Sequence, residues 1–183
     1  MKLSYTEKFL IAIILLILIK FLMSHSGNFS VSNSVSQKNL GMTFTDFKGY
    51  FYSKALANDL PQFSLYRAKI DDVENGYMCT FDCEVVMGVE VDKQTDSIIK
   101  ISVAAQPFKK KTKDETTALM LNQSAIFSLA AMVFSPKMEN QALRELFMKK
   151  LLKDVNDAPY IMDNMRYKSL YLNETLFLVI EPE

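Results

Sequence analysis

The chain has 183 residues with 21 basic and 21 acidic side chains, and its apolar content of 49% includes 13 Phe and 8 Tyr. So many large apolar side chains exclude an intrinsically disordered protein. The balanced charge excludes the strongly basic surface by which nucleic-acid-binding proteins attract phosphates.

The N-terminal residues 1–26 form an apolar leader. Eleven uninterrupted apolar residues run from Phe9 to Ile19, after a short start that carries two lysines. This pattern is typical of a secretory signal peptide. An uncleaved anchor needs about 20 apolar residues, and the stretch of residues 9–23 is only 15 residues long and includes Lys20. We therefore expect a signal peptide or a signal-anchor that contacts the membrane through residues 9–23. Either one puts the rest of the chain outside the cytoplasmic membrane, in the periplasm or the extracellular space.

Residues 27–41 are predicted to be a flexible tether, because Ser, Gly and Asn make up seven of the first twelve residues and show no helical periodicity. A single domain follows over residues 42–183. Its first helix begins at a cap provided by Thr43 or Thr45 and ends near Asn58. The apolar residues of this helix recur at helical spacing: Phe44, Phe47, Phe51 and Leu56.

The middle of the chain has the pattern of a sheet. From Tyr77 to Asp92 every odd position is apolar, which predicts one long strand with one buried face. Its length exceeds that of a usual strand, so we expect a bend or bulge near Gly88. A less regular strand over residues 63–70 precedes it and a strand over residues 98–105 follows it, each across a short polar turn. Short turns connect antiparallel neighbours, so the sequence predicts a three-stranded meander.

The last third of the chain predicts two helices and a hairpin. Asp114 caps a helix that reaches Phe134, and Ser135-Pro136 begins a second helix that ends near Asn156. These helices form an αα-hairpin. Two strands over residues 164–172 and 175–180 form a C-terminal hairpin that extends the sheet. The predicted buried stripes of the two helices are Ala118, Leu121, Ala125, Leu129 and Met132, then Leu143, Leu146, Phe147 and Leu151.

The predicted fold class is therefore α+β. An antiparallel sheet, made of a three-stranded meander plus a C-terminal hairpin, packs against an αα-hairpin and one N-terminal helix. The apolar leader precedes this domain.

The sequence nominates no catalytic, cofactor or metal site. His25 is the only histidine and lies at the exit of the leader, so the domain has no base for a Ser-His-Asp or Cys-His relay. Two cysteines alone cannot fill a structural zinc site. No glycine-rich phosphate-binding pattern occurs. We expect a protein without enzymatic activity and without a cofactor.

The two cysteines, Cys79 and Cys83, are four residues apart. On a straight strand that spacing separates them by about 13 Å, whereas a disulfide needs Cα atoms within about 7 Å. Two interpretations stay open. They are separate core thiols, or the chain folds back between them and brings them into reach of a disulfide.

Two groups of residues are candidates for contact with a partner. Tyr160, Tyr167 and Tyr171 crowd the C-terminal hairpin, and tyrosine is favoured in protein interfaces. Their alternative role is to cover the core. The second group is a basic loop that suits anionic lipid or an acidic partner, or else is a solvated connector. It consists of Lys109, Lys110, Lys111 and Lys113.

These features together favour a non-catalytic envelope protein, tethered to the membrane or exported, that acts by binding another protein. An inhibitor, an immunity or exclusion-type factor, or an assembly factor fits this description. The alternative is a carrier that holds a lipid or other apolar ligand between sheet and helices, because 11 Met and 13 Phe provide adaptable apolar walls. The sequence predicts no nucleic-acid partner and leaves the oligomeric state open.

Overall fold

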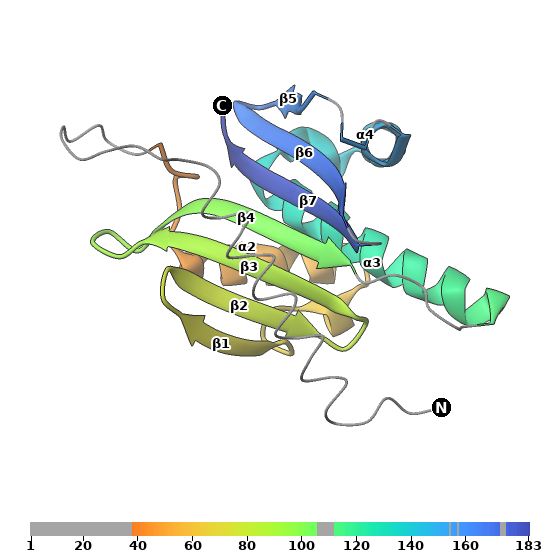
Figure 1. The fold of residues 1–183 in the computed structure, drawn as a ribbon, viewed down its shortest axis with the longest axis horizontal. Coiled ribbons are helices and arrows are strands. Elements are labelled where there is room, and N and C mark those ends of the chain that lie inside the picture. Colours follow the sequence, from red (N-terminus) through yellow and green to blue (C-terminus); the bar gives the residue numbers. More distant parts are fainter. Residues whose placement is uncertain (1–37, 106–111, 154, 157, 173–174) are drawn as a thin grey trace. The chain divides into compact units, whose positions relative to one another are not determined.

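The structure is a computed structural model that describes residues 38–105, 112–153, 155–156, 158–172 and 175–183 (Figure 1). The leader, residues 1–26 with its apolar stretch over residues 9–23, lies outside these described residues, and so does most of the predicted tether. Three helices, α2, α3 and α4, and two short 3-10 helices, η1 and η2, accompany seven strands. Their bounds in chain order are α2 Phe44–Ala57, η1 Pro61–Phe63, β1 Lys69–Val73, β2 Gly76–Phe81, β3 Val85–Asp92, β4 Ser97–Ala105, α3 Lys113–Phe134, η2 Pro136–Glu139, α4 Gln141–Lys153, β5 Tyr160–Met162, β6 Met165–Leu172 and β7 Thr175–Pro182.

All seven strands belong to one antiparallel sheet, in the order β1-β2-β3-β4-β7-β6-β5. The pairing of β4 with β7 joins the meander to the C-terminal strands. This confirms the predicted α+β class and the hairpin that extends the sheet. It also makes β1 and β5 the two edge strands.

Helices α2 and α3 lie across one face of the sheet, as Figure 1 shows. Phe47 and Phe51 of α2 and Leu129 of α3 are fully buried against sheet residues such as Met87 and Ile101. Thr43 caps α2, as predicted, in a reciprocal capping box with Asp46. Helix α3 begins at a second capping box, between Thr112 and Glu115, rather than at Asp114.

The predicted long strand over residues 77–92 is two strands, so the meander has four strands instead of three. The chain reverses at Asp82, Cys83 and Glu84, and Glu84 adopts a positive φ of 60°. A turn of three residues keeps the odd positions of β2 and β3 on the same face, because Phe81 pairs with Val85. The alternation therefore continues through the turn and conceals it.

Three other elements differ from the prediction. The helix predicted to run from Ser135-Pro136 to Asn156 is the 3-10 helix η2 followed by α4, which begins at Gln141 and ends at Lys153. Residues 63–70 are not a strand over their whole length. Instead η1 and a turn lead into β1, which begins at Lys69. The polar segment before β2 is itself mostly strand, so only Glu74 and Asn75 remain as the turn. The short strand β5 was not predicted.

The helical stripes were predicted only in part. Leu129 and Met132 are buried, but Leu121 is 66% exposed. Phe147 and Leu151 of α4 are buried, whereas Leu143 and Leu146 are exposed. One helix among the described residues, α3 over Asp114–Phe134, is long and apolar enough to cross a membrane. Half of its most apolar window is buried inside the fold, as in the core helix of a globular domain.

Candidate partner-binding surface

The edge strand β5 is formed by a tight hairpin with β6. Asp163 and Asn164 occupy the two-residue turn with φ values of 53° and 61°, the conformation of a type I′ turn. Asp and Asn tolerate this left-handed conformation better than other side chains. Because Met162 and Met165 flank a two-residue turn, they form a hydrogen-bonded pair. Ile161 then belongs to a non-hydrogen-bonded pair, so its backbone N–H and C=O point away from β6 toward the open edge.

An aromatic cluster supports β5 from the side of the helices. The Phe147 ring lies edge-on to Tyr160 and Tyr167, with centroids 5.5 and 5.1 Å away. Phe147 is buried and Tyr167 has no exposed area. The outer side of Tyr160 faces Lys150, whose Nζ lies 4.9 Å from the ring centroid. Tyr160 is therefore held between an apolar anchor and a cation.

A groove of about 570 Å³ runs along β5. Helix α4 contributes Leu143, which is 47% exposed, and the strand contributes Ile161, which is 48% exposed. Lys137 and Asp163 mark one end. The complete lining is Lys137, Leu143, Tyr160, Ile161, Met162, Asp163, Asn164 and Glu183.

An ion pair fixes the turn at the end of the groove. Lys137 Nζ lies 2.7 Å from Asp163 Oδ1, and the Ser135 hydroxyl donates a hydrogen bond to Asp163 Oδ2. These two donors lower the pKa of Asp163, and the Asp163 carboxylate raises the pKa of Lys137. The Tyr167 hydroxyl is buried close to Ser135 and this pair, but no group among the described residues meets hydrogen-bond geometry with it. Burial raises the pKa of Tyr167.

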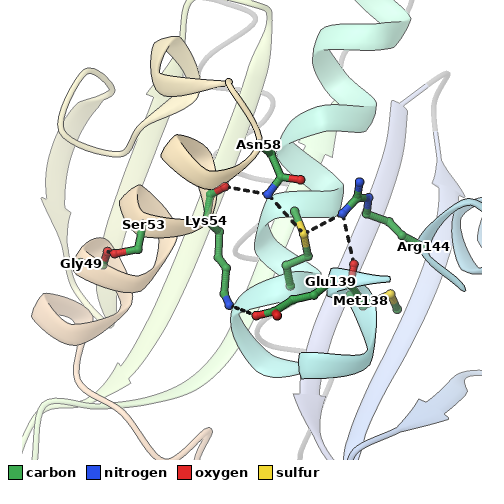
Figure 2. Close-up of polar contacts among 8 residues, drawn as sticks. Gly49, Ser53, Lys54, Asn58, Met138, Glu139 and Arg144 are labelled. Atoms are coloured by element: carbon green, nitrogen blue, oxygen red, sulfur yellow. Dashed lines mark hydrogen bonds and ion pairs between the residues drawn. The ribbon is translucent and has the colours of Figure 1, made fainter. Parts of the chain in front are cut away.

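A polar network holds α4 in position behind the groove (Figure 2). Arg144 Nη1 donates to the Met138 carbonyl at 3.2 Å and lies 3.1 Å from the Met132 sulfur. The Asn58 amide contacts the same sulfur at 3.9 Å, and Lys54 pairs with Glu139. The network connects α2, α3, η2 and α4, so Leu143, the neighbour of Arg144, projects from a fixed backbone.

The C-terminal half of α4 is basic. Lys149, Lys150 and Lys153 are exposed, and none of them forms an ion pair with another described residue. Leu146, which is 66% exposed, lies one turn from Lys150. The exposed side of α4 therefore combines apolar and positively charged side chains.

The predicted contact residues lie in different places. Tyr160 lines the groove, Tyr167 lies in the core behind it, and Tyr171 is 53% exposed near the far end of β6. Lys109, Lys110 and Lys111 lie outside the described residues, and Lys113 begins α3. Leu143, Ile161 and Lys150 complete the surface and were not predicted. Only the strand order shows that these apolar and basic side chains lie at an exposed edge, so the sequence alone could not identify them.

The two cysteines are free thiols in the structure. Cys79 is buried on β2 and Cys83 lies in the turn that follows, so the chain does fold back, but between Phe81 and Val85. Burial raises the pKa of Cys79 to about 12 and that of Cys83 to about 11. Thiols with raised pKa values are weak nucleophiles at neutral pH. Cys83 also lines a second pocket, of about 290 Å³, with Arg67, Asp82 and Asn122 among its other residues.

Among the residues that the structure describes, no cluster of His, Cys, Asp and Glu side chains is suited to holding a metal ion. Comparison of the chain with protein-family models, with curated proteins and with solved structures gives no match. A functional proposal therefore depends on the geometry of the chain's own side chains, and the surface formed by β5 and α4 offers the most specific one.

Proposed function

We propose that the protein is a non-catalytic binding protein of the cell envelope, tethered to the membrane or exported through residues 1–26. It acts by binding another protein through the surface that β5 and α4 form. The observation that carries this proposal is the apolar edge strand β5, which lies open beside a groove lined by Leu143, Tyr160 and Ile161. An inhibitor or an assembly factor needs such a surface and no catalytic groups.

Three properties of the surface support a protein as the ligand. Its apolar side chains are partly exposed and clustered, which is typical of the centre of an interface. The ring of Tyr160 is held rigidly by Phe147, so little conformational entropy is lost when it makes a contact. The surrounding lysines provide a charged rim that favours an oppositely charged partner.

Site-specific photocrosslinking in the native host tests the proposal. A photoreactive benzoylphenylalanine replaces Ile161 in the full chain, and the matched control carries it at Ile70, an isoleucine of the other edge strand that is 36% exposed. We expect one discrete protein adduct from position 161 and none from position 70. The adduct should disappear when Leu143→Glu is added, because a charge then enters the groove.

Absence of an adduct at position 161, or equal adducts at both positions, would contradict the proposal. Native mass spectrometry of the same preparation examines the rival function. A co-purified lipid whose loss accompanies loss of the crosslink would favour the carrier of an apolar ligand instead.

A further inference from the structure

We infer that the partner contributes an extended segment that pairs with β5 as an additional strand of the sheet. The segment carries two apolar side chains separated by one residue, and an acidic side chain beside them. This inference rests on the proposed function and specifies how the partner is recognised.

The backbone of β5 is prepared for this pairing. Ile161 directs its N–H and C=O outward, and within the part of the chain that the structure describes β6 is the only strand that pairs with β5. One residue of an incoming segment exchanges two hydrogen bonds with such a position. Addition of a strand to an open sheet edge is a common mode of peptide recognition, in which backbone bonds supply affinity and pockets for alternate side chains supply specificity.

The groove determines which side chains the segment carries. The residue opposite Ile161 lies on the same face of the sheet as Ile161, and its two neighbours lie on the face of Tyr160 and Met162. That face is the side of α4, where Leu143 forms the wall of the groove. The two residues of the partner segment that flank the one opposite Ile161 are therefore apolar.

The charge of α4 determines the flanking residue. Lys150 stands over Tyr160, and Lys149 and Lys153 lie nearby on the same exposed side of the helix. Since none of these lysines forms an ion pair with another described residue, a carboxylate at the Tyr160 end of the segment has cationic side chains to pair with.

An anionic membrane is the other ligand that combines apolar and acidic character. It fits this surface less well, because hydrocarbon offers no hydrogen-bond partner to the open edge of β5. A flat bilayer also cannot enter the groove that Leu143 and Tyr160 line. The backbone edge thus favours a peptide segment over a lipid surface.

The test selects ligands without assuming the partner. The full chain in detergent is panned against a displayed library of random linear peptides, and binding of the selected peptides is measured by fluorescence polarisation. Ile161→Pro removes the outward N–H at an edge position where proline is tolerated, whereas Ile161→Ala keeps that N–H. Asp72→Pro is the matched control, since Asp72 pairs with Tyr77 and directs its backbone away from β2 in the same way.

We expect selected peptides to share the apolar pattern with an adjacent Asp or Glu. Ile161→Pro should weaken their binding by about tenfold or more, since it removes the donor of one of the two backbone hydrogen bonds and leaves the partner's carbonyl unpaired. Ile161→Ala should have a smaller effect and Asp72→Pro none. Lys150→Glu should weaken binding, and N-methylation of the peptide should abolish it at one residue only, the residue opposite Ile161. Circular dichroism of each variant confirms that the fold is retained.

Three results would overturn the inference: no peptide is selected, the selected peptides bind Ile161→Pro normally, or the chain binds phosphatidylglycerol vesicles through Leu143 and Leu146 regardless of Ile161→Pro. The crosslink from position 161 separates this failure from failure of the proposed function. If the adduct persists while peptide binding ignores Ile161→Pro, the partner docks as a folded surface and only the strand pairing is wrong.

Discussion

The two edges of the sheet are built in opposite ways. On β1, Lys69 and Asp71 form an ion pair at 2.7 Å, and Asp72 Oδ1 lies 3.8 Å from Nζ of Lys93, in the turn between β3 and β4. The Lys93 amino group also approaches the Val73 carbonyl at 3.4 Å. On β5, Tyr160, Ile161 and Met162 carry no charge. Charged side chains are a common protection of an open edge against pairing with another chain.

The difference is what the proposed contact at β5 requires, because a partner strand needs an edge without charged side chains. A strand of three residues is a weak template for aggregation because it is short. The anchors behind it, Phe147 and the turn ion pair of Asp163, nevertheless hold it in a fixed position. A protected edge needs no such support. A recognition edge does, since a rigid edge loses less conformational entropy on binding.

The largest expected effect is on the support of β5. Phe147→Ala removes a buried ring that contacts both Tyr160 and Tyr167. The free energy of unfolding should fall by about 4 kcal/mol, measured by equilibrium urea denaturation. The neighbouring Leu146→Ala, at a side chain that is 66% exposed, should change it by less than about 0.5 kcal/mol. Equal effects would mean that the aromatic cluster does not hold the recognition edge.

The corresponding change near the protected edge is Gly76→Ala. Gly76 begins β2 with φ +148°, and a Cβ there would lie 1.9 Å from the Val89 carbonyl oxygen. We expect a loss of about 3 kcal/mol in the free energy of unfolding, because the backbone of β3 blocks the new methyl group. The control is Gly49→Ala in α2, where nothing lies within 4 Å. It should raise stability by roughly 0.5–1 kcal/mol in the same denaturation assay. A tolerated Gly76→Ala would mean that the β1 hairpin can shift.

Exchange of the edge chemistry tests the comparison directly. Ile161→Lys gives β5 the charge that β1 has, and Asp72→Ile gives β1 an apolar side chain beside Ile70. Both sites are exposed, so each should change the free energy of unfolding by less than about 0.5 kcal/mol. Asp72→Ile should increase self-association measured by light scattering, whereas Ile161→Lys should weaken binding of the selected peptides without increasing self-association. If Ile161→Lys increased self-association and Asp72→Ile did not, β5 would be the edge protected against pairing with another chain.

Local patterns predicted the elements whose signals lie in neighbouring residues. The capping residue Thr43 and the terminator Asn58 bound α2. The two strands of the last hairpin, which pair from Met165 with Pro182 to Leu172 with Thr175, were predicted as separate strands. The reversal at residues 82–84 could not be found in this way, because a three-residue turn preserves the alternation on both sides. By periodicity alone, β2 and β3 cannot be distinguished from one continuous strand.

The candidate surface was harder to predict because it depends on contacts between distant segments. Leu143 and Phe147 fit the same helical stripe, yet only Phe147 faces the sheet. Tyr160 was nominated by residue type alone. Ile161 carries no local signal, since its exposure follows from the strand order that leaves β5 at the end of the sheet.

The smallest expected effect is the pH dependence of the turn beside β5. Lys137 and Ser135 lower the pKa of Asp163 below its ordinary value of 3.8, so the ionised carboxylate stabilises the folded state. This stabilisation is fully present above pH 3.8 and is lost as the pH falls through the lowered pKa. Since the Lys137 side chain is 62% exposed, solvent and salt screen the interaction and the effect is small.

Asp163→Asn isolates this contribution, because asparagine keeps the left-handed turn and cannot ionise. Its stability relative to the parent should be lower at neutral pH, and the difference should shrink as the pH falls below 3.8. Lys137→Gln should remove most of the same pH-dependent difference, and the double variant should lose little more, because the two side chains form one interaction. Urea denaturation of the parent and of each variant, from neutral pH to below pH 3.8, measures these differences in stability. Parallel pH profiles of Asp163→Asn and the parent would mean that the ion pair does not hold the turn, and that the rigidity of the β5 edge comes from Phe147 alone.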